Sequence, residues 1–265
     1  MSRIVPIILL LAAVPAYAQT VPTTAPAASE PAATAPDDTS SEARAILDLL
    51  EKRGDTLKDF HGTLAYSVYH AKTDEAEAND GYIDYIKAPT GGTRFSVRRS
   101  NIKLDGKIMK QNLELDMVFD GQWLTLIDPL KKIFRRIQVA PPVAPGQPAP
   151  NVMKIDGPIP MPIGQKTADV IKEFQVQLLP TKDENLLQLK LTPRIKGKYD
   201  FSELDLTIDR RMQIPVKMVS TAPRGDVTTV EFHDLQINQD HAKIIDVKTP
   251  DQKDGWTVEI TPLKP

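Results

Sequence analysis

The 265-residue sequence contains no cysteine. This absence excludes disulfide bonds, thiolate nucleophiles, iron–sulfur clusters and zinc sites built on cysteine. It also excludes a lipid anchor attached through an N-terminal cysteine thiol. An excess of positive charge is lacking too, because 33 Lys and Arg face 35 Asp and Glu. Nucleic-acid-binding proteins normally carry a basic excess, so we expect no nucleic-acid partner.

The sequence also lacks the short motifs that accompany common enzyme sites. It has no G-x-S-x-G elbow, H-E-x-x-H pair, phosphate-binding loop or G-x-G-x-x-G turn. The four histidines show no metal-ligand spacing, and the two in expected strands, His61 and His233, are predicted to point to solvent. We therefore expect no enzyme activity, no metal and no cofactor.

Clusters of charge have simple interpretations. The acidic run Asp74, Glu75, Glu77 and Asp80 lacks the spacing of a calcium loop and is interpreted as a solvated hairpin turn. The basic pairs 98–99 and 135–136 lie near expected strands. Such pairs are typical of protected edge strands, and a contact with an anionic membrane surface is the alternative.

Long apolar runs are absent except at the N-terminus. Arg3 precedes an apolar stretch over 4–14, and Ala16-Tyr17-Ala18 follows. These parts predict a secretory signal peptide over 1–18, too short to span a bilayer. We expect export to the bacterial periplasm. Residues 19–40, rich in Ala, Pro and Thr, predict a disordered spacer.

The first ordered element expected is a helix over 41–53. Ser40 or Ser41 provides an N-cap, Ile46, Leu49 and Leu50 recur at helical spacing, and Gly54 ends the pattern. From Phe60 onward the apolar period changes to two, which predicts strands.

About ten to twelve strands are expected, separated by turns such as 105–106, 120–121 and 254–255. Each alternates one apolar with one polar face, which favours antiparallel pairing. So many strands must curl. We predict one domain over 41–265, mainly β with some α. It is built on a single large curved antiparallel sheet.

A proline-rich insertion over 140–165 interrupts this pattern. Its second part is apolar yet alternates Gly and Pro, so it fits neither a helix nor a central strand. Two interpretations stay open: a lid over an apolar cavity, with Met153, Ile159 and Met161 as candidate lid residues, or a packed loop.

Several stretches resemble the periplasmic outer-membrane lipoprotein carriers, the LolA-like superfamily. They are the helix and strand entry at 46–60, the strand pair at 83–95, and the hairpin at 118–136 with its Asp120-Gly121 turn. The last is the most specific. The sequence departs from the family pattern at Lys87, where arginine is common, and at Ile127, where an aromatic is usual.

The resemblance implies an incomplete antiparallel barrel, with the N-terminal helix and a lid covering its concave apolar face, and acyl chains as ligands. Arg94 is similar to the arginine that holds the family's lid, so we expect it to act as a latch. The candidate cavity-lining residues, which core packing would explain equally well, are Met117, Phe119, Leu124, Leu126, Ile133 and Ile137.

As partners the resemblance implies a lipid or acylated lipoprotein, an inner-membrane loading complex and an outer-membrane acceptor, bound by a monomer. The alternative is an envelope sensor or structural protein that uses the same fold to bind a protein partner and transports nothing.

Overall fold

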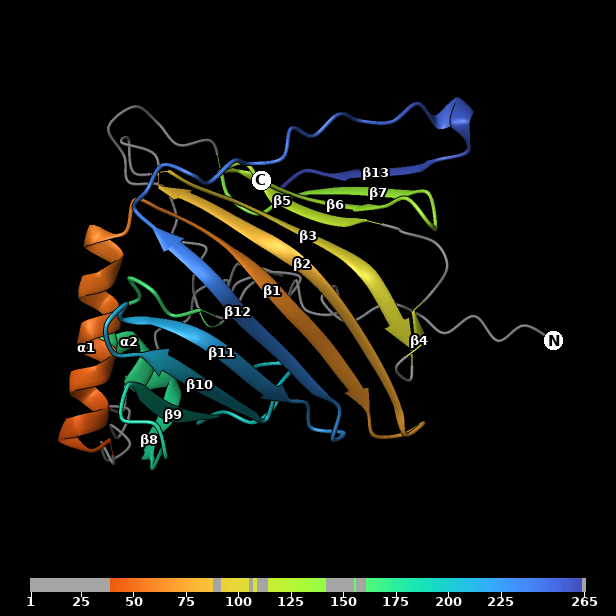
Figure 1. Cartoon of the computed structure of the whole chain (residues 1–265). Coiled ribbons are helices and arrows are strands. Elements are labelled where there is room, and N and C mark those ends of the chain that lie inside the picture. Colours follow the sequence, from red (N-terminus) through yellow and green to blue (C-terminus); the bar gives the residue numbers. More distant parts are fainter. Residues whose placement is uncertain are drawn as a thin grey trace, which may run out of the picture.

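The computed structural model describes residues 39–87, 92–104, 107–108, 114–141, 155 and 161–263. The expected signal peptide and nearly all of the expected spacer lie outside these residues. The described chain forms one long curved sheet, with a long helix at one end and a short helix nearby (Figure 1). This confirms the predicted fold class.

Within the described residues, the sheet contains thirteen strands. The strands are β1 (Asp59–His70), β2 (Glu75–Lys87), β3 (Thr93–Leu104), β4 (Lys107–Ile108), β5 (Leu115–Phe119), β6 (Trp123–Asp128), β7 (Ile133–Gln138), β8 (Phe174–Leu179), β9 (Leu186–Pro193), β10 (Glu203–Asp209), β11 (Ile214–Thr221), β12 (Val227–Ile237) and β13 (Thr257–Thr261). The helices are α1 (Ser41–Thr56), α2 (Thr167–Glu173) and the 3-10 turn η1 (Gln252–Asp254).

The strand order is β13-β7-β6-β5-β3-β2-β1-β12-β11-β10-β9-β8, with β4 beside β3. Its two ends, β13 and β8, are not paired with each other in the described chain, so the sheet stays open. Every strand pair that the structure describes is antiparallel except β13 with β7, which is parallel. The expectation of a purely antiparallel sheet is therefore wrong at this edge, because the chain crosses the sheet before it adds β13.

Helix α1 is longer than predicted. The hydroxyl of its N-cap Ser40 accepts a hydrogen bond from the Ala43 N–H, as expected of a capping serine. The helix passes through Gly54 and ends at Thr56, so Gly54 is not its C-terminal residue. A Cβ on Gly54 would lie 2.2 Å from the Gly164 Cα. This glycine therefore lets two backbone segments approach closely, and it does not form a turn.

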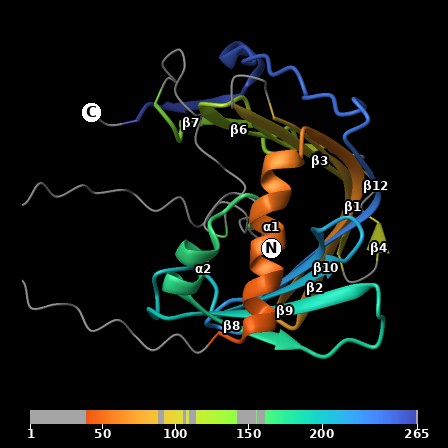
Figure 2. The ribbon, with the colours of Figure 1, turned by 90° about the vertical axis from the view of Figure 1, so that its left-hand side faces the viewer.

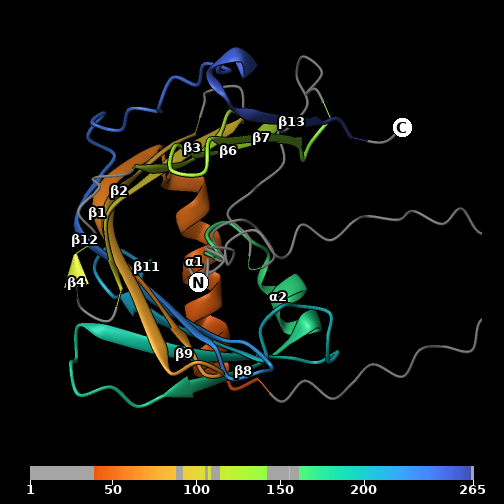
Figure 3. The same cartoon turned by 90° about the vertical axis from the view of Figure 1, so that its right-hand side faces the viewer.

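The main core lies on the concave face of the sheet, which bends around α1 (Figure 2, Figure 3). Leu47 and Leu50 of α1 are buried together with the inward side chains of both halves of the sheet. Strand β1 joins these halves, because it pairs with β2 on one side and with β12 on the other.

The chain between β12 and β13, residues 238–256, crosses the convex face; we call it the strap (Figure 1). The backbone N–H of Lys243 donates to Asp84 Oδ1, and that of Ile245 donates to Ser96 Oγ. Asp84 and Ser96 alternate with the inward Ile83, Tyr85 and Phe95, so they belong to the outer face. The strap thus covers polar side chains that would otherwise meet water.

Among the described residues, no helix is both long and apolar enough to span a membrane.

Candidate functional site

The six candidate cavity-lining residues lie on one face of the sheet. The strand register places Met117 opposite Leu126 and Phe119 opposite Leu124. Leu124 is in turn opposite Ile137. Since side chains alternate along a strand, Ile133 shares this face. Phe119 is opposite the inward Phe95, so this is the concave face.

Burial of these six side chains falls toward the β7 edge. Met117, Phe119 and Leu124 belong to the main core, with exposed fractions of 8%, 0% and 5%. Leu126 packs against that core but is only partly buried, and Ile133 and Ile137 are half-buried. The same face therefore passes from tight packing into a partly exposed surface at β6 and β7, where Arg135, opposite Leu126, forms an ion pair with Glu259 of β13.

Aromatic rings occupy the packed part of the face. Phe60 stacks on Tyr85 with ring centroids 5.1 Å apart, and Phe95 stacks on Phe119 at 5.7 Å. Burial raises the pKa of Tyr85 to about 12. Sequence reasoning emphasised aliphatic side chains because only 6% of residues are aromatic. It missed that four of these rings meet on neighbouring strands.

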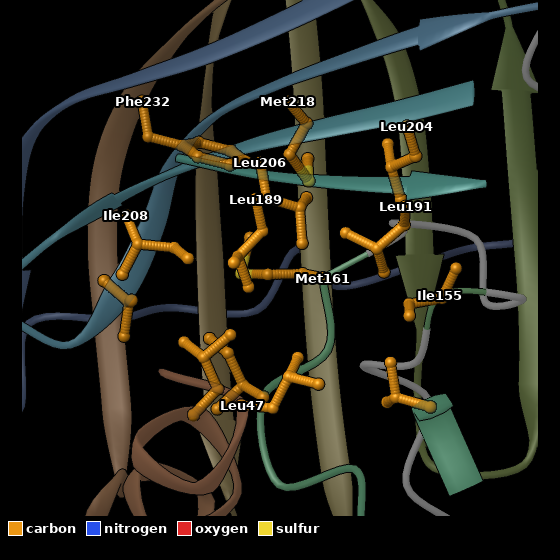
Figure 4. Packing of buried hydrophobic residues seen from close by; sticks show 14 of the residues in the cluster. Leu47, Ile155, Met161, Leu189, Leu191, Leu204, Leu206, Ile208, Met218 and Phe232 are labelled. Carbon is orange, nitrogen blue, oxygen red and sulfur yellow. The ribbon is translucent and has the colours of Figure 1, made fainter. Parts of the chain in front are cut away.

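Part of the proline-rich insertion covers the concave face. Met161 is 1% exposed and lies between Leu47 of α1 and Leu189 of the sheet (Figure 4). Ile155 and Ile163 are buried in the same cluster. The Gly164 N–H donates to the Leu50 carbonyl at 3.0 Å, which ties this segment to α1. The other two candidate lid residues, Met153 and Ile159, lie outside the described residues.

Arg94, the expected latch, does not lie on the concave face. Its side chain is exposed and alternates with the buried, inward Phe95 and Val97. A latch to a segment over the concave face would need the opposite orientation, so Arg94 is not placed for this role.

The surroundings of the arginine pair 98–99 and of His61 differ from those predicted from the sequence. The pair 98–99 lies on β3, an internal strand, so it protects no edge. Arg98 lies on the outer face and binds Asp116 through two hydrogen bonds, of 2.7 and 2.8 Å, while Arg99 faces inward. His61 Nδ1 lies 2.8 Å from Asp84 Oδ1, so this histidine is paired rather than simply solvated.

The acidic run is not a solvated turn throughout. β2 begins at Glu75, and Glu77 is only 6% exposed on the same face as Ile83 and Tyr85. Asn79, two residues further, is 1% exposed. The alternation of β2 contained this signal, because both residues share the parity of its inward apolar side chains.

No family model and no curated protein sequence matches this chain. Among solved structures, a chain of the Pseudomonas aeruginosa MucA/MucB complex is similar, with 16% identity and a TM-score of 0.44. The match covers 78% of this chain but only 64% of that one.

Two similar structures carry names from the family that the sequence resembles. One is a putative outer membrane lipoprotein-sorting protein domain from Vibrio parahaemolyticus, with 12% identity, coverage of 76% and 95%, and a TM-score of 0.36. The other is a LolA superfamily protein from Nitrosomonas europaea, with 12% identity, coverage of 78% and 94%, and a TM-score of 0.29. Identities and TM-scores this low carry no function over to this chain.

No group of three or more His, Asp or Glu in the described part of the chain is placed to hold a metal ion. The concave face offers mostly apolar surface, which is buried at its centre and half-buried at β6 and β7.

Proposed function

We propose that this protein binds acyl chains of lipids or lipoproteins on its concave face and carries them through the periplasm toward the outer membrane. The supporting observation is the continuous inward face of β5, β6 and β7. It passes from the fully buried Phe119 to the half-buried Ile133 and Ile137 without changing face.

The chemistry of such a carrier is burial of hydrocarbon. Each methylene removed from water stabilises the complex by roughly 0.8 kcal/mol, so a chain of ordinary length binds without any polar contact. Methionine suits this role because its flexible side chain adapts to irregular shapes, and Met117 lies on the same face. The carrier must also release its ligand, which favours a partly exposed surface over a closed pocket.

The test is native mass spectrometry of the exported protein, purified without detergent and then extracted with organic solvent. We expect bound lipid or acylated peptide near one equivalent. Ile137→Asp, on the concave face, should lower this occupancy severalfold, since a carboxylate in contact with an acyl chain loses hydration.

Ile260→Asp is the matched control, because Ile260 lies beside Arg136 on the outer face of β13 and is 55% exposed. It should leave occupancy unchanged. A protein that is lipid-free as isolated and takes up no added lipid would contradict the proposal.

A second function, binding of a protein partner without transport, is favoured by the β13 edge. β13 stands at the end of the strand order, and Ile260 and Leu263 nearby are 55% and 46% exposed. Edge strands with exposed apolar side chains pair readily with another chain. Under this function Ile260→Asp would weaken partner binding and Ile137→Asp would not.

A further inference from the structure

A second, polar group of side chains occupies the concave face at the other end of β2. Glu77 and Asn79 are buried there, and the Asn79 Nδ2 donates to Glu77 Oε1 at 3.5 Å. Asn79 is opposite Tyr66 of β1, which is itself 4% exposed. An amide and a carboxylate thus lie side by side among the buried side chains of the concave face.

Arg99 completes the group from the neighbouring strand. Its guanidinium carbon lies 4.7 Å from the centre of the Tyr66 ring. Burial raises the pKa of Tyr66, while the positive charge of Arg99 and a hydrogen bond between the two side chains act in the opposite direction.

The reach of Arg99 depends on Gly81. This glycine separates Leu64 of β1 from Arg99 of β3 on the inward face. A Cβ on Gly81 would lie 1.9 Å from the Arg98 carbonyl oxygen. The missing side chain lets the two strands approach and leaves the space over β2 that Arg99 crosses.

This polar group has unused hydrogen-bonding capacity. Asn79 Oδ1 is buried and has no hydrogen-bond partner. Among the described residues, we find no hydrogen bond to the Glu77 carboxylate other than the long one from Asn79. A buried acceptor without a donor is costly, so such groups are rare unless something else satisfies them. Two neighbouring oxygen acceptors suit a ligand that donates several hydrogen bonds.

We propose that Glu77, Asn79 and Arg99 form a head-group site for a phospholipid that carries a primary ammonium and a phosphate, such as an ethanolamine phospholipid. The ammonium donates to Glu77 and Asn79 Oδ1, and the phosphate accepts from Arg99. The inference rests on the proposed function, because the acyl chains of this lipid lie on the apolar face that begins at Ile83 and Val97.

Charge favours this class. The site holds one negative and one positive side chain, which complements a zwitterion better than an anion. Arg99 is opposite Gly81, two residues from Asn79 on the same face, and its guanidinium lies over the ring of Tyr66, which is itself opposite Asn79. The positive charge therefore reaches the part of the face that holds Glu77 and Asn79. A choline head group has the same charges but no N–H to donate.

The experiment compares head groups on identical chains. The exported protein is incubated with vesicles of equal parts phosphatidylethanolamine, phosphatidylcholine and phosphatidylglycerol, re-isolated, and its bound lipids are quantified by mass spectrometry. We expect ethanolamine lipid to be enriched roughly tenfold over choline lipid, the factor typical of hydrogen bonds to a charged group. Glu77→Gln and Asn79→Leu should bring this ratio close to one while lipid uptake continues.

Asp80→Asn is the matched control, since Asp80 follows Asn79 in β2 but pairs with Lys103 on the outer face. It should keep the enrichment. Glu77→Gln preserves the side-chain shape. If Asn79→Leu does not fold, Glu77→Gln tests the head-group site on its own. Equal uptake of the three lipids, enrichment of the glycerol lipid, or unchanged enrichment in Glu77→Gln overturns the head-group site only. Absence of any lipid uptake overturns the proposed function as well.

Discussion

Asp84 Oδ1 accepts a hydrogen bond of 2.9 Å from the backbone N–H of Lys243, a residue 159 positions later in the chain. The same oxygen lies 2.8 Å from His61 Nδ1. One buried carboxylate on β2 therefore holds both a neighbouring strand and the strap.

Removing this carboxylate should destabilise the fold. Asp84→Ala leaves the Lys243 N–H and the His61 ring without their acceptor, which should lower the free energy of unfolding by about 1–3 kcal/mol. Asp84→Asn retains an oxygen acceptor and should lose less. Urea denaturation followed by circular dichroism measures both. Equal midpoints for wild type and Asp84→Ala would show that the strap does not depend on this contact.

The burial gradient along the concave face predicts unequal costs of truncation. Phe119→Ala removes a ring with 0% exposure and should cost about 3–5 kcal/mol of stability. Ile137→Ala removes a half-buried side chain and should cost under about 1.5 kcal/mol. The same denaturation experiment compares them. Similar large losses would mean that the β6–β7 end is packed as tightly as the centre.

Gly54 offers a test of the contact between α1 and the segment after the insertion. Alanine favours helices by about 1 kcal/mol over glycine, so Gly54→Ala would stabilise an isolated helix. Here its Cβ would meet backbone atoms of Gly164, so we expect a net loss of about 1–3 kcal/mol. Lys52→Ala, at an exposed position of the same helix, should change stability by less than about 0.5 kcal/mol.

Tyr85 should make stability depend on pH in the alkaline range. Its pKa rises from 10.0 to about 12 because the folded state buries the phenol. The unfolded chain therefore loses this proton first, and the stability linked to it, up to about 2–3 kcal/mol, is complete below pH 10 and lost as pH approaches 12. Tyr85→Phe should show a smaller decline than wild type between these values. Parallel declines would contradict the assignment.

Local sequence patterns predicted most of the fold. Alternation located the strands, and the Asp120-Gly121 turn formed as expected: Asp120 Oδ1 accepts from the Gln122 and Trp123 N–H groups, and Gly121 has φ 107°. Pairing between distant strands has no comparable local signal. Neither the contact of β1 with β12 nor the parallel addition of β13 follows from alternation, because both depend on where a long connection crosses the sheet.

The site was predicted less completely, for a different reason. The register places the six apolar candidates on one face, since side-chain parity is a local property. How far each is buried depends on what packs above it, and sequence cannot give that. Glu77 shows the opposite error: its charge suggested solvent, while its parity with Ile83 and Tyr85 already placed it inward.

The position of β1 in the middle of the sheet bears on how the chain is made. Synthesis delivers β1 and β2 early, but the other edge of β1 stays unpaired until Val227–Ile237 has emerged. Until then the nascent protein exposes a long strand edge with Leu64 and Tyr66 beside it, a form prone to association with other chains. A chaperone that holds this edge, or a premature stop before Val227, would therefore decide between folding and aggregation.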